Sequence, residues 1–160
     1  MMVTLKIISV GTLKEDYLKE AVDEYKKRLM QFARVEEVNL KEEKINDENN
    51  RTEILSALKK EGERIIKAAP RDSVRIALCV EGQERSSEEF ASLISKAADK
   101  CGKITLIIGS SHGLSDEVKH DADFRISFSK MTFPHQLMRV ILTEALYRAF
   151  TIISGKKYHK

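Results

Sequence analysis

One short run of residues combines side chains that suit the binding of a polar, ring-containing ligand. Residues 127–136 read Ser-Phe-Ser-Lys-Met-Thr-Phe-Pro-His-Gln, so rings, hydroxyl groups and a cation follow one another where a strand gives way to a helix. This mixture fits a ligand that has both an aromatic ring and polar groups. A helix-capping loop with Phe128 and Phe133 packed in the core has the same composition, so the run alone leaves both interpretations open.

A second candidate is the glycine loop, residues 109–113 (Gly-Ser-Ser-His-Gly), which follows the most apolar strand candidate. Glycine lets the backbone approach a ligand and exposes its N–H groups. The spacing matches neither the dinucleotide-binding fingerprint nor the phosphate-binding P-loop. Taken alone, the segment favours a tight turn without a ligand. We interpret it, together with residues 127–136, as part of a site for a small cofactor.

The remaining candidates for chemistry are histidines and the C-terminal tail. Imidazole exchanges protons near neutral pH, so His135 could act as a base or orient a substrate, although a lone helical histidine is more often structural. The four histidines lack metal-ligand spacing, so we predict no metal, and no Ser-His-Asp or Cys-His arrangement is supported. Tyr158 and His159 could stack on a base while Lys160 meets phosphate, or the tail could fray in solvent.

Length and composition predict one soluble domain. The chain has 160 residues, 42% of them hydrophobic, which is enough for a single domain over residues 1–160 with a proper core. No apolar run approaches the roughly 20 residues that cross a membrane, and the N-terminus lacks an apolar signal segment. We therefore expect a cytoplasmic protein with no membrane partner. Two cysteines are too few for a disulfide framework, and Cys79 is expected in the core.

Charge is distributed unevenly, although the net charge is only +3. Residues 128–160 carry six basic side chains and one acidic side chain, whereas the preceding residues carry 22 basic and 24 acidic ones. A basic C-terminal part fits contact with a polyanion. Ordinary surface charge explains this count at least as well.

The pattern of apolar residues predicts strands and helices in alternation. Apolar runs rich in β-branched residues indicate strands, and apolar residues three or four apart indicate helices. Strands are expected at residues 3–10, 35–40, 73–80, 103–108 and 124–128, and helices at 14–30, 52–68, 86–100, 115–120 and 134–153. Ser86 and Ser115 are expected to cap the third and fourth helices. This order favours an α/β fold with a mostly parallel sheet and helices on both faces.

Two features of this scheme bear on function. Ligands of open α/β sheets bind beyond the carboxyl ends of the strands. In this chain, three predicted strand ends lie at residues 78–82, 108–113 and 128–133. The helix at 134–153 is apolar on more than one side. One side would cover the sheet and the other needs a second partner, so we predict a homodimer.

Three motifs together resemble those of a known family. Residues 128–139 (FSKMTFPHQLMR), Glu144 with the run 147–150 (YRAF), and residues 158–160 (YHK) closely resemble the RlmH family. These are ribosomal large-subunit RNA pseudouridine-N3 methyltransferases of the SPOUT class. The similarity extends to the N-terminus and to residues 60–62 (KEG), so it covers essentially the whole chain. It implies an α/β fold with a deep trefoil knot near the C-terminus, and a homodimer in which the tail of one subunit completes the site of the other.

The resemblance also implies S-adenosyl-L-methionine as methyl donor and N3 of a pseudouridine in 23S rRNA as acceptor. It implies cofactor binding by Leu78, Gly109, Phe128, Ser129, Lys130, Met131, Thr132 and Phe133. The glycine loop departs from the family pattern at Ser110, where a second glycine is expected, and His112 stands at a variable position. The resemblance implies assembled ribosomes, and not DNA, as the substrate. The lack of a separate RNA-binding domain fits this, because few phosphate contacts give modest affinity for isolated RNA.

Methyl transfer to N3 needs the acceptor placed in line with an already electrophilic methyl group, and it needs loss of the N3 proton. Our candidates for assisting that loss are His135, Arg139 and His159, and Tyr158 would stack on the base or orient it. A rival hypothesis is an α/β protein that binds a nucleotide or RNA through the same basic face and catalyses no reaction.

Overall fold

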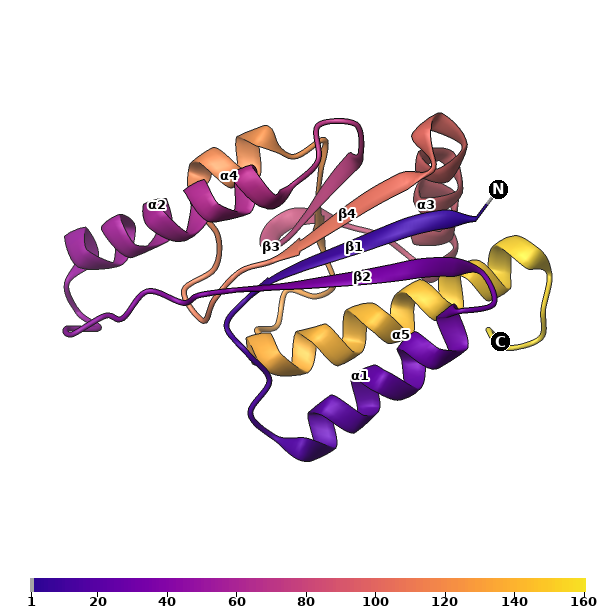
Figure 1. Cartoon of the computed structure of the whole chain (residues 1–160), viewed down its shortest axis with the longest axis horizontal. Helices are drawn as coiled ribbons and strands as arrows, with labels where there is room; N and C mark the ends of the chain where they lie inside the picture. The colour runs from indigo at the N-terminus through magenta and orange to yellow at the C-terminus, as the bar shows by residue number, and fades with distance from the viewer. Residues whose placement is uncertain (1) are drawn as a thin grey trace.

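The sheet has five strands, and its neighbouring strands are parallel throughout. A computed structural model describes residues 2–160 (Figure 1). The strands are β1 (Val3–Val10), β2 (Ala33–Leu40), β3 (Val74–Glu84), β4 (Lys103–Ile108) and β5 (Phe124–Ser127), in the spatial order β2-β1-β4-β3-β5. The predicted parallel sheet is confirmed, and the carboxyl ends of the strands meet at one edge.

Five helices alternate with these strands. They are α1 (Asp16–Leu29), α2 (Arg51–Ala68), α3 (Ser87–Cys101), α4 (Asp116–Asp121) and α5 (His135–Ser154). Each lies within two residues of its expected bounds. Ser86 and Ser115 cap α3 and α4 as predicted, because their side-chain oxygens accept hydrogen bonds from the amides of Glu89 at 3.1 Å and Val118 at 3.3 Å.

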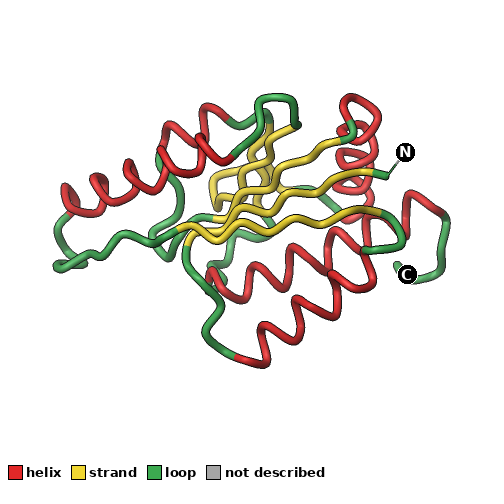
Figure 2. The backbone as a smooth tube through the Cα atoms, viewed as in Figure 1, coloured by secondary structure: helices red, strands yellow, loops and turns green. Residues whose placement is uncertain are grey.

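Helices cover both faces of the sheet, as expected (Figures 1 and 2). The strands send alternate side chains to the two faces, because the side-chain period of a strand is two. Leu5 and Ile7 pack with α1, α3 and α5 in one core cluster. Ile8 and Val10 pack with α2 and α4 in the other.

β3 continues beyond its predicted end. The chain bulges out between Leu78 and Gln83, and both of these residues take Ile126 of β5 as their partner in the ladder. Gly82 allows this return, because a Cβ there would lie 2.6 Å from the carbonyl carbon of Ile126. The bulge carries residues 79–81 out of the ladder at the carboxyl edge of the sheet.

α5 runs from the carboxyl edge of the sheet to the opposite edge and contacts both α1 and α3 (Figure 1). Its second apolar side therefore has partners within the chain, so the two-sided pattern does not by itself require a second subunit. Leu137 and Ile153 remain 37% and 42% exposed. The homodimer stays a prediction. Among residues 2–160, no helix combines the length and the apolar character needed to cross a membrane.

Candidate functional site

A cavity of about 690 Å³ opens at the carboxyl edge of the sheet. Its walls come from the ends of β3, β4 and β5, from the glycine loop after β4, and from the loop that leads into α5. Because β4, β3 and β5 are adjacent and parallel, residues 108–114, 126–129 and 131–135 line one space. The position and size of the cavity suit a small-molecule ligand.

Seven of the eight positions expected to bind a cofactor line this cavity. They are Leu78, Gly109, Phe128, Ser129, Met131, Thr132 and Phe133. Lys130 belongs to the same loop, but it is not among the lining residues. The fold therefore gathers these seven residues from three separate segments, and their role in binding stays a prediction.

The loop before α5 is shaped by its own hydroxyl groups. Ser127 Oγ donates to the Ser129 carbonyl at 2.9 Å, and Ser129 Oγ accepts from the Met131 amide at 2.9 Å. Phe128 lines the cavity and also packs edge-on against Phe90 of α3, with ring centroids 5.8 Å apart. Phe128 thus packs in the core and also lines the cavity. The helix-capping and the ligand-binding interpretations of residues 127–136 are therefore compatible.

The glycine loop is a tight turn that lies close to the end of β4. The Gly113 amide donates to the Ser110 carbonyl at 2.9 Å, and Gly113 has a φ of +89°. A Cβ on Gly109 would lie 2.6 Å from the Gly113 carbonyl carbon, so a larger residue does not fit there. Within residues 2–160, a positive φ occurs only at glycines. Ser110 therefore occupies its position without backbone strain.

The two candidate catalytic groups on α5 differ in surroundings. His135, in the first turn, lines the cavity. Arg139 is only 6% exposed and is not a lining residue. Its guanidinium donates to the side-chain oxygen of Asn39 at 2.7 Å and to the carbonyl of Gly11 at 3.4 Å, and burial lowers the pKa of Arg139. Arg139 thus joins the ends of β1 and β2 to α5.

The C-terminal tail leaves the last turn of α5 and folds back towards the end of α1 (Figure 1). The Tyr158 hydroxyl donates to Glu144 Oε1 at 3.0 Å, and burial together with this carboxylate raises the pKa of Tyr158 to about 12. His159 lies between the Arg148 guanidinium at 3.1 Å and the Glu88 carboxylate at 2.7 Å. Glu144 lies in the middle of α5 and Glu88 at the start of α3, so the tail packs beside the second half of α5. Tyr158 and His159 do not line the cavity of their own chain, so the four predicted catalytic residues do not line one cavity within one chain.

Comparison with known proteins agrees with this geometry. A family model described as "Predicted SPOUT methyltransferase" matches residues 3–159. Ribosomal RNA large subunit methyltransferase H from Caldicellulosiruptor bescii is 51% identical over 156 residues, which cover 98% of this chain and 99% of the relative. The chain belongs to the RlmH family of SPOUT methyltransferases.

Two further relatives of the same name support membership of the RlmH family. The protein from Carboxydothermus hydrogenoformans is 48% identical over 157 residues, and that from Caldicellulosiruptor saccharolyticus is 47% identical over 156 residues. Each alignment covers 98% of this chain and 99% of the relative, so the similarity is not confined to the motifs.

In this RlmH-family chain, the bulge of β3 supplies lining residues that the sequence motifs do not include. Cys79, expected in the core, is only partly buried and lines the cavity with Val80 and Glu81. Burial raises the pKa of the Cys79 thiol. Lys119 of α4 pairs with Glu81, and this hydrogen bond lowers the pKa of the Glu81 carboxyl. The strand end at residues 78–82, where a ligand is expected from the sequence, includes all three positions.

The histidines of this RlmH-family chain lie apart from one another. Within the described residues 2–160, no three His, Cys, Asp or Glu side chains gather in a way that could hold a metal ion. His112 pairs with Glu48 at 2.7 Å, and His120 Nδ1 lies 2.8 Å from the Asp116 carbonyl oxygen. His135 is the histidine of α5 and lines the cavity beside the glycine loop.

Proposed function

We propose that the protein transfers a methyl group from S-adenosyl-L-methionine to N3 of a pseudouridine in 23S rRNA. The observation that carries this proposal is the cavity at the carboxyl edge, where the glycine loop meets the loop before α5. Its support from sequence is the full-length similarity to proteins named ribosomal RNA large subunit methyltransferase H.

The lining residues fit this cofactor. At Gly109 the backbone comes so close to Gly113 that there is no room for a Cβ, so the turn requires glycine at this lining position. Leu78, Phe128 and Met131 offer apolar surface to the adenine ring and to the aliphatic part of the methionine chain, and hydroxyl groups lie beside them. When bound, the cofactor would supply an electrophilic methyl group on a sulfonium. These lining residues would hold it, and we assign no contact to Lys130.

In the proposed reaction, a bond forms between N3 and the methyl carbon, the sulfonium–methyl bond breaks, and the N3 proton leaves. His135 lines the cavity and takes this proton on a ring nitrogen. Arg139 holds the segment around Gly11 against α5, so that His135 keeps its direction. Tyr158 stacks on the target base or orients it, and His159 assists loss of the proton.

We also propose the homodimer in which the tail of one subunit acts at the cavity of the other. Its support is that Tyr158 and His159 are bound by Glu144 and Glu88 and do not line the cavity of their own chain. Mixing two inactive variants tests it, with Gly109→Ala damaging the cavity and His159→Ala damaging the tail. If subunits exchange freely, about a quarter of the sites regain an intact cavity and tail, and activity returns accordingly. Absence of recovery despite proven exchange contradicts the shared site.

A trefoil knot is part of the same proposal. The glycine loop and the loop before α5 converge on one cavity, and α5 leaves directly from it. Threading of α5 through the preceding loop would fix both loops around a cofactor. Continuous experimental density from β5 through α5 decides whether the chain passes through that loop or around it.

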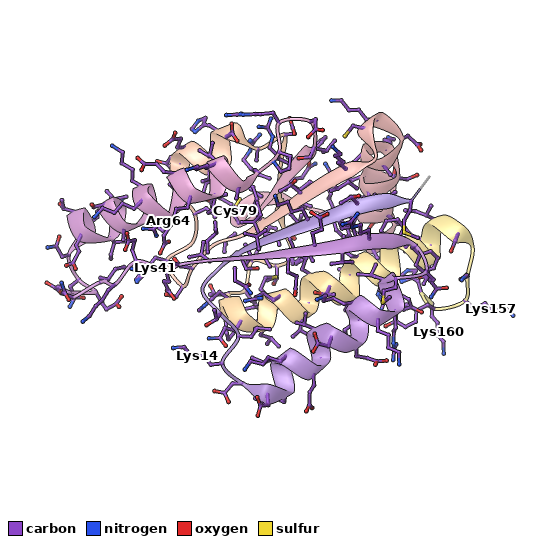
Figure 3. The ribbon with its side chains drawn as sticks, viewed as in Figure 1. Lys14, Lys41, Arg64, Cys79, Lys157 and Lys160 are labelled. Atoms are coloured by element: carbon purple, nitrogen blue, oxygen red, sulfur yellow. The ribbon has the colours of Figure 1, made fainter. Side chains whose placement is uncertain are left out.

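We propose assembled cytoplasmic ribosomes as the substrate. Figure 3 shows Lys157 and Lys160 at the outer end of the tail, beside the end of α1, and both are exposed. Lys156 is also exposed, and its ammonium group lies 4.8 Å from the centre of the Phe32 ring. Few cations gather here, so affinity for isolated RNA is expected to be modest and to fall with added salt.

The deciding experiment is transfer of labelled methyl groups to ribosomes that lack the native modification, followed by mapping of the labelled nucleotide. Label on N3 of a pseudouridine in 23S rRNA supports the proposal. Cofactor binding by calorimetry without transfer to any ribosomal RNA contradicts it and favours a protein that binds nucleotide or RNA without catalysis.

A further inference from the structure

A buried carboxylate on α2 bonds to the glycine loop in the cavity wall, although it does not line the cavity itself. Glu61 is 3% exposed, although it carries an ionisable group. Its Oε1 accepts a hydrogen bond from Ser110 Oγ at 3.0 Å, and its Oε2 accepts one from the Glu43 amide at 2.9 Å. Ser110 is itself only 6% exposed. One carboxylate therefore holds both the glycine loop and the segment that leads into α2.

The neighbouring glycine explains how α2 comes close enough for this contact. A Cβ on Gly62 would lie 3.2 Å from Val118 Cγ2 and would clash with Ser115 Oγ. Ser115 caps α4 and is separated from the glycine loop by Leu114 alone. Gly62, which on helix propensity alone weakens α2, thus permits close packing of α2 on α4 and brings Glu61 to Ser110.

Burying a carboxylate is costly, and burial raises the pKa of Glu61. A buried carboxylate is tolerated when its hydrogen bonds are satisfied and stabilise a particular conformation of the chain. The bond to Ser110 fixes the residue whose carbonyl accepts from the Gly113 amide and so closes the turn. This turn is a wall of the cavity.

We infer that Glu61 is a positioning residue for the cofactor site and that it acts through Ser110 to hold the glycine loop in its binding conformation. The inference rests on the proposed function, since it concerns the same cavity. It gives Ser110 a purpose: where a second glycine is expected from the resemblance, this chain has a hydroxyl group that anchors the loop to α2.

Four variants test this inference. Glu61→Ala removes both hydrogen bonds, and Ser110→Ala removes only the one from the loop. In Glu61→Gln the amide oxygen still accepts from Glu43, while the amide nitrogen donates to the serine oxygen, which can also accept. Glu53→Ala is the matched control, because Glu53 also lies on α2 and accepts from the Asn46 amide at 2.6 Å, but it does not bond the glycine loop.

The first readout is hydrogen exchange of the loop amides in the protein without cofactor. We expect Glu61→Ala and Ser110→Ala each to speed exchange at residues 109–113 by roughly tenfold, the double variant to add little more, and Glu61→Gln to stay within about threefold of the parent. Glu53→Ala should speed exchange only near Asn46.

The second readout is the dissociation constant for S-adenosyl-L-methionine and the division of any activity loss between KM and kcat. We expect Glu61→Ala and Ser110→Ala to raise the dissociation constant and KM by roughly tenfold with little change in kcat, and Glu53→Ala to change neither.

The outcomes separate the two proposals. Unchanged loop exchange in Ser110→Ala, or equal loosening of the glycine loop in Glu53→Ala, overturns the positioning role even if the parent protein binds cofactor and methylates. If the parent binds no S-adenosyl-L-methionine, the proposed function fails and the cofactor role of Glu61 fails with it, whatever the exchange rates show. Loosening confined to the variants at Glu61 and Ser110, together with weaker binding, supports the inference.

Discussion

The two halves of α5 present candidate catalytic groups in opposite states. At the start of the helix, His135 faces a cavity of about 690 Å³. Beside the second half of the helix, Tyr158 and His159 are engaged by Glu144 of α5 and Glu88 of α3 at 3.0 and 2.7 Å. The cavity is thus ready to accept a ligand, whereas the tail is held by groups of its own chain. The difference teaches that residues of one set of motifs need not share a site within one chain. The proposed homodimer would bring the tail of one subunit to the cavity of the other.

The largest loss of activity should come from a substitution that displaces the glycine loop in the cavity wall. In Gly109→Ala the new methyl group meets the Gly113 carbonyl, so the loop must shift, and we expect kcat/KM to fall roughly 100-fold or more. Gly102→Ala is the matched control. Gly102 has a φ of +69° but no atom within 4 Å of a Cβ, so this variant should lose about 1–2 kcal/mol of stability and keep its cofactor affinity. Equal cofactor affinity in the parent and Gly109→Ala would refute the role of the loop.

Removal of the His159 side chain should slow methyl transfer without weakening cofactor binding. We expect His159→Ala to lower the single-turnover rate of methyl transfer by about 10- to 100-fold and to leave the cofactor dissociation constant unchanged, because His159 does not line the cavity of its own chain. Glu88→Gln is a control that alters the hydrogen-bond partner of His159 at 2.7 Å and leaves the imidazole in place. Unchanged transfer in His159→Ala would remove this residue from the mechanism.

A variant at Arg139 tests whether this residue takes part in catalysis or holds the ends of β1 and β2 to α5. Arg139→Lys loses the forked contact with Asn39 and Gly11, and we expect it to lower the free energy of unfolding by about 1–3 kcal/mol. Chemical denaturation measures this loss. Methyl transfer below the melting transition should fall by less than tenfold. A stable variant that has lost nearly all transfer would instead make Arg139 catalytic.

The smallest effect concerns the ionisation of Tyr158. Burial and Glu144 favour the neutral phenol, so its pKa rises from the ordinary 10.0 to about 12. The stability that follows from this shift is fully present below pH 10.0 and is lost as pH rises through about 12. The ultraviolet titration of the parent minus that of Tyr158→Phe reports this pKa, and Glu144→Gln should lower it. A difference spectrum that titrates near 10.0 would show that the tail is not held as described.

Much of the fold could be predicted because its signals are local. The apolar pattern placed β1 and β4 at their observed bounds, and the serines at 86 and 115 cap helices as expected. The end of β3 could not be predicted, because the pairing of Ile126 with both Leu78 and Gln83 depends on a strand far along the chain. Cys79 was misplaced in the core for the same reason.

For the site, the sequence by itself determined which segments are candidates for the chemistry: the glycine loop, the loop before α5 and the tail. It did so because residue types and their spacing are properties of short segments. Only the tertiary structure decided that the first two segments share a cavity, that the tail packs beside the second half of α5, and that Glu61 reaches Ser110. Those relations depend on strand order and helix packing, which bring together residues that are distant in sequence.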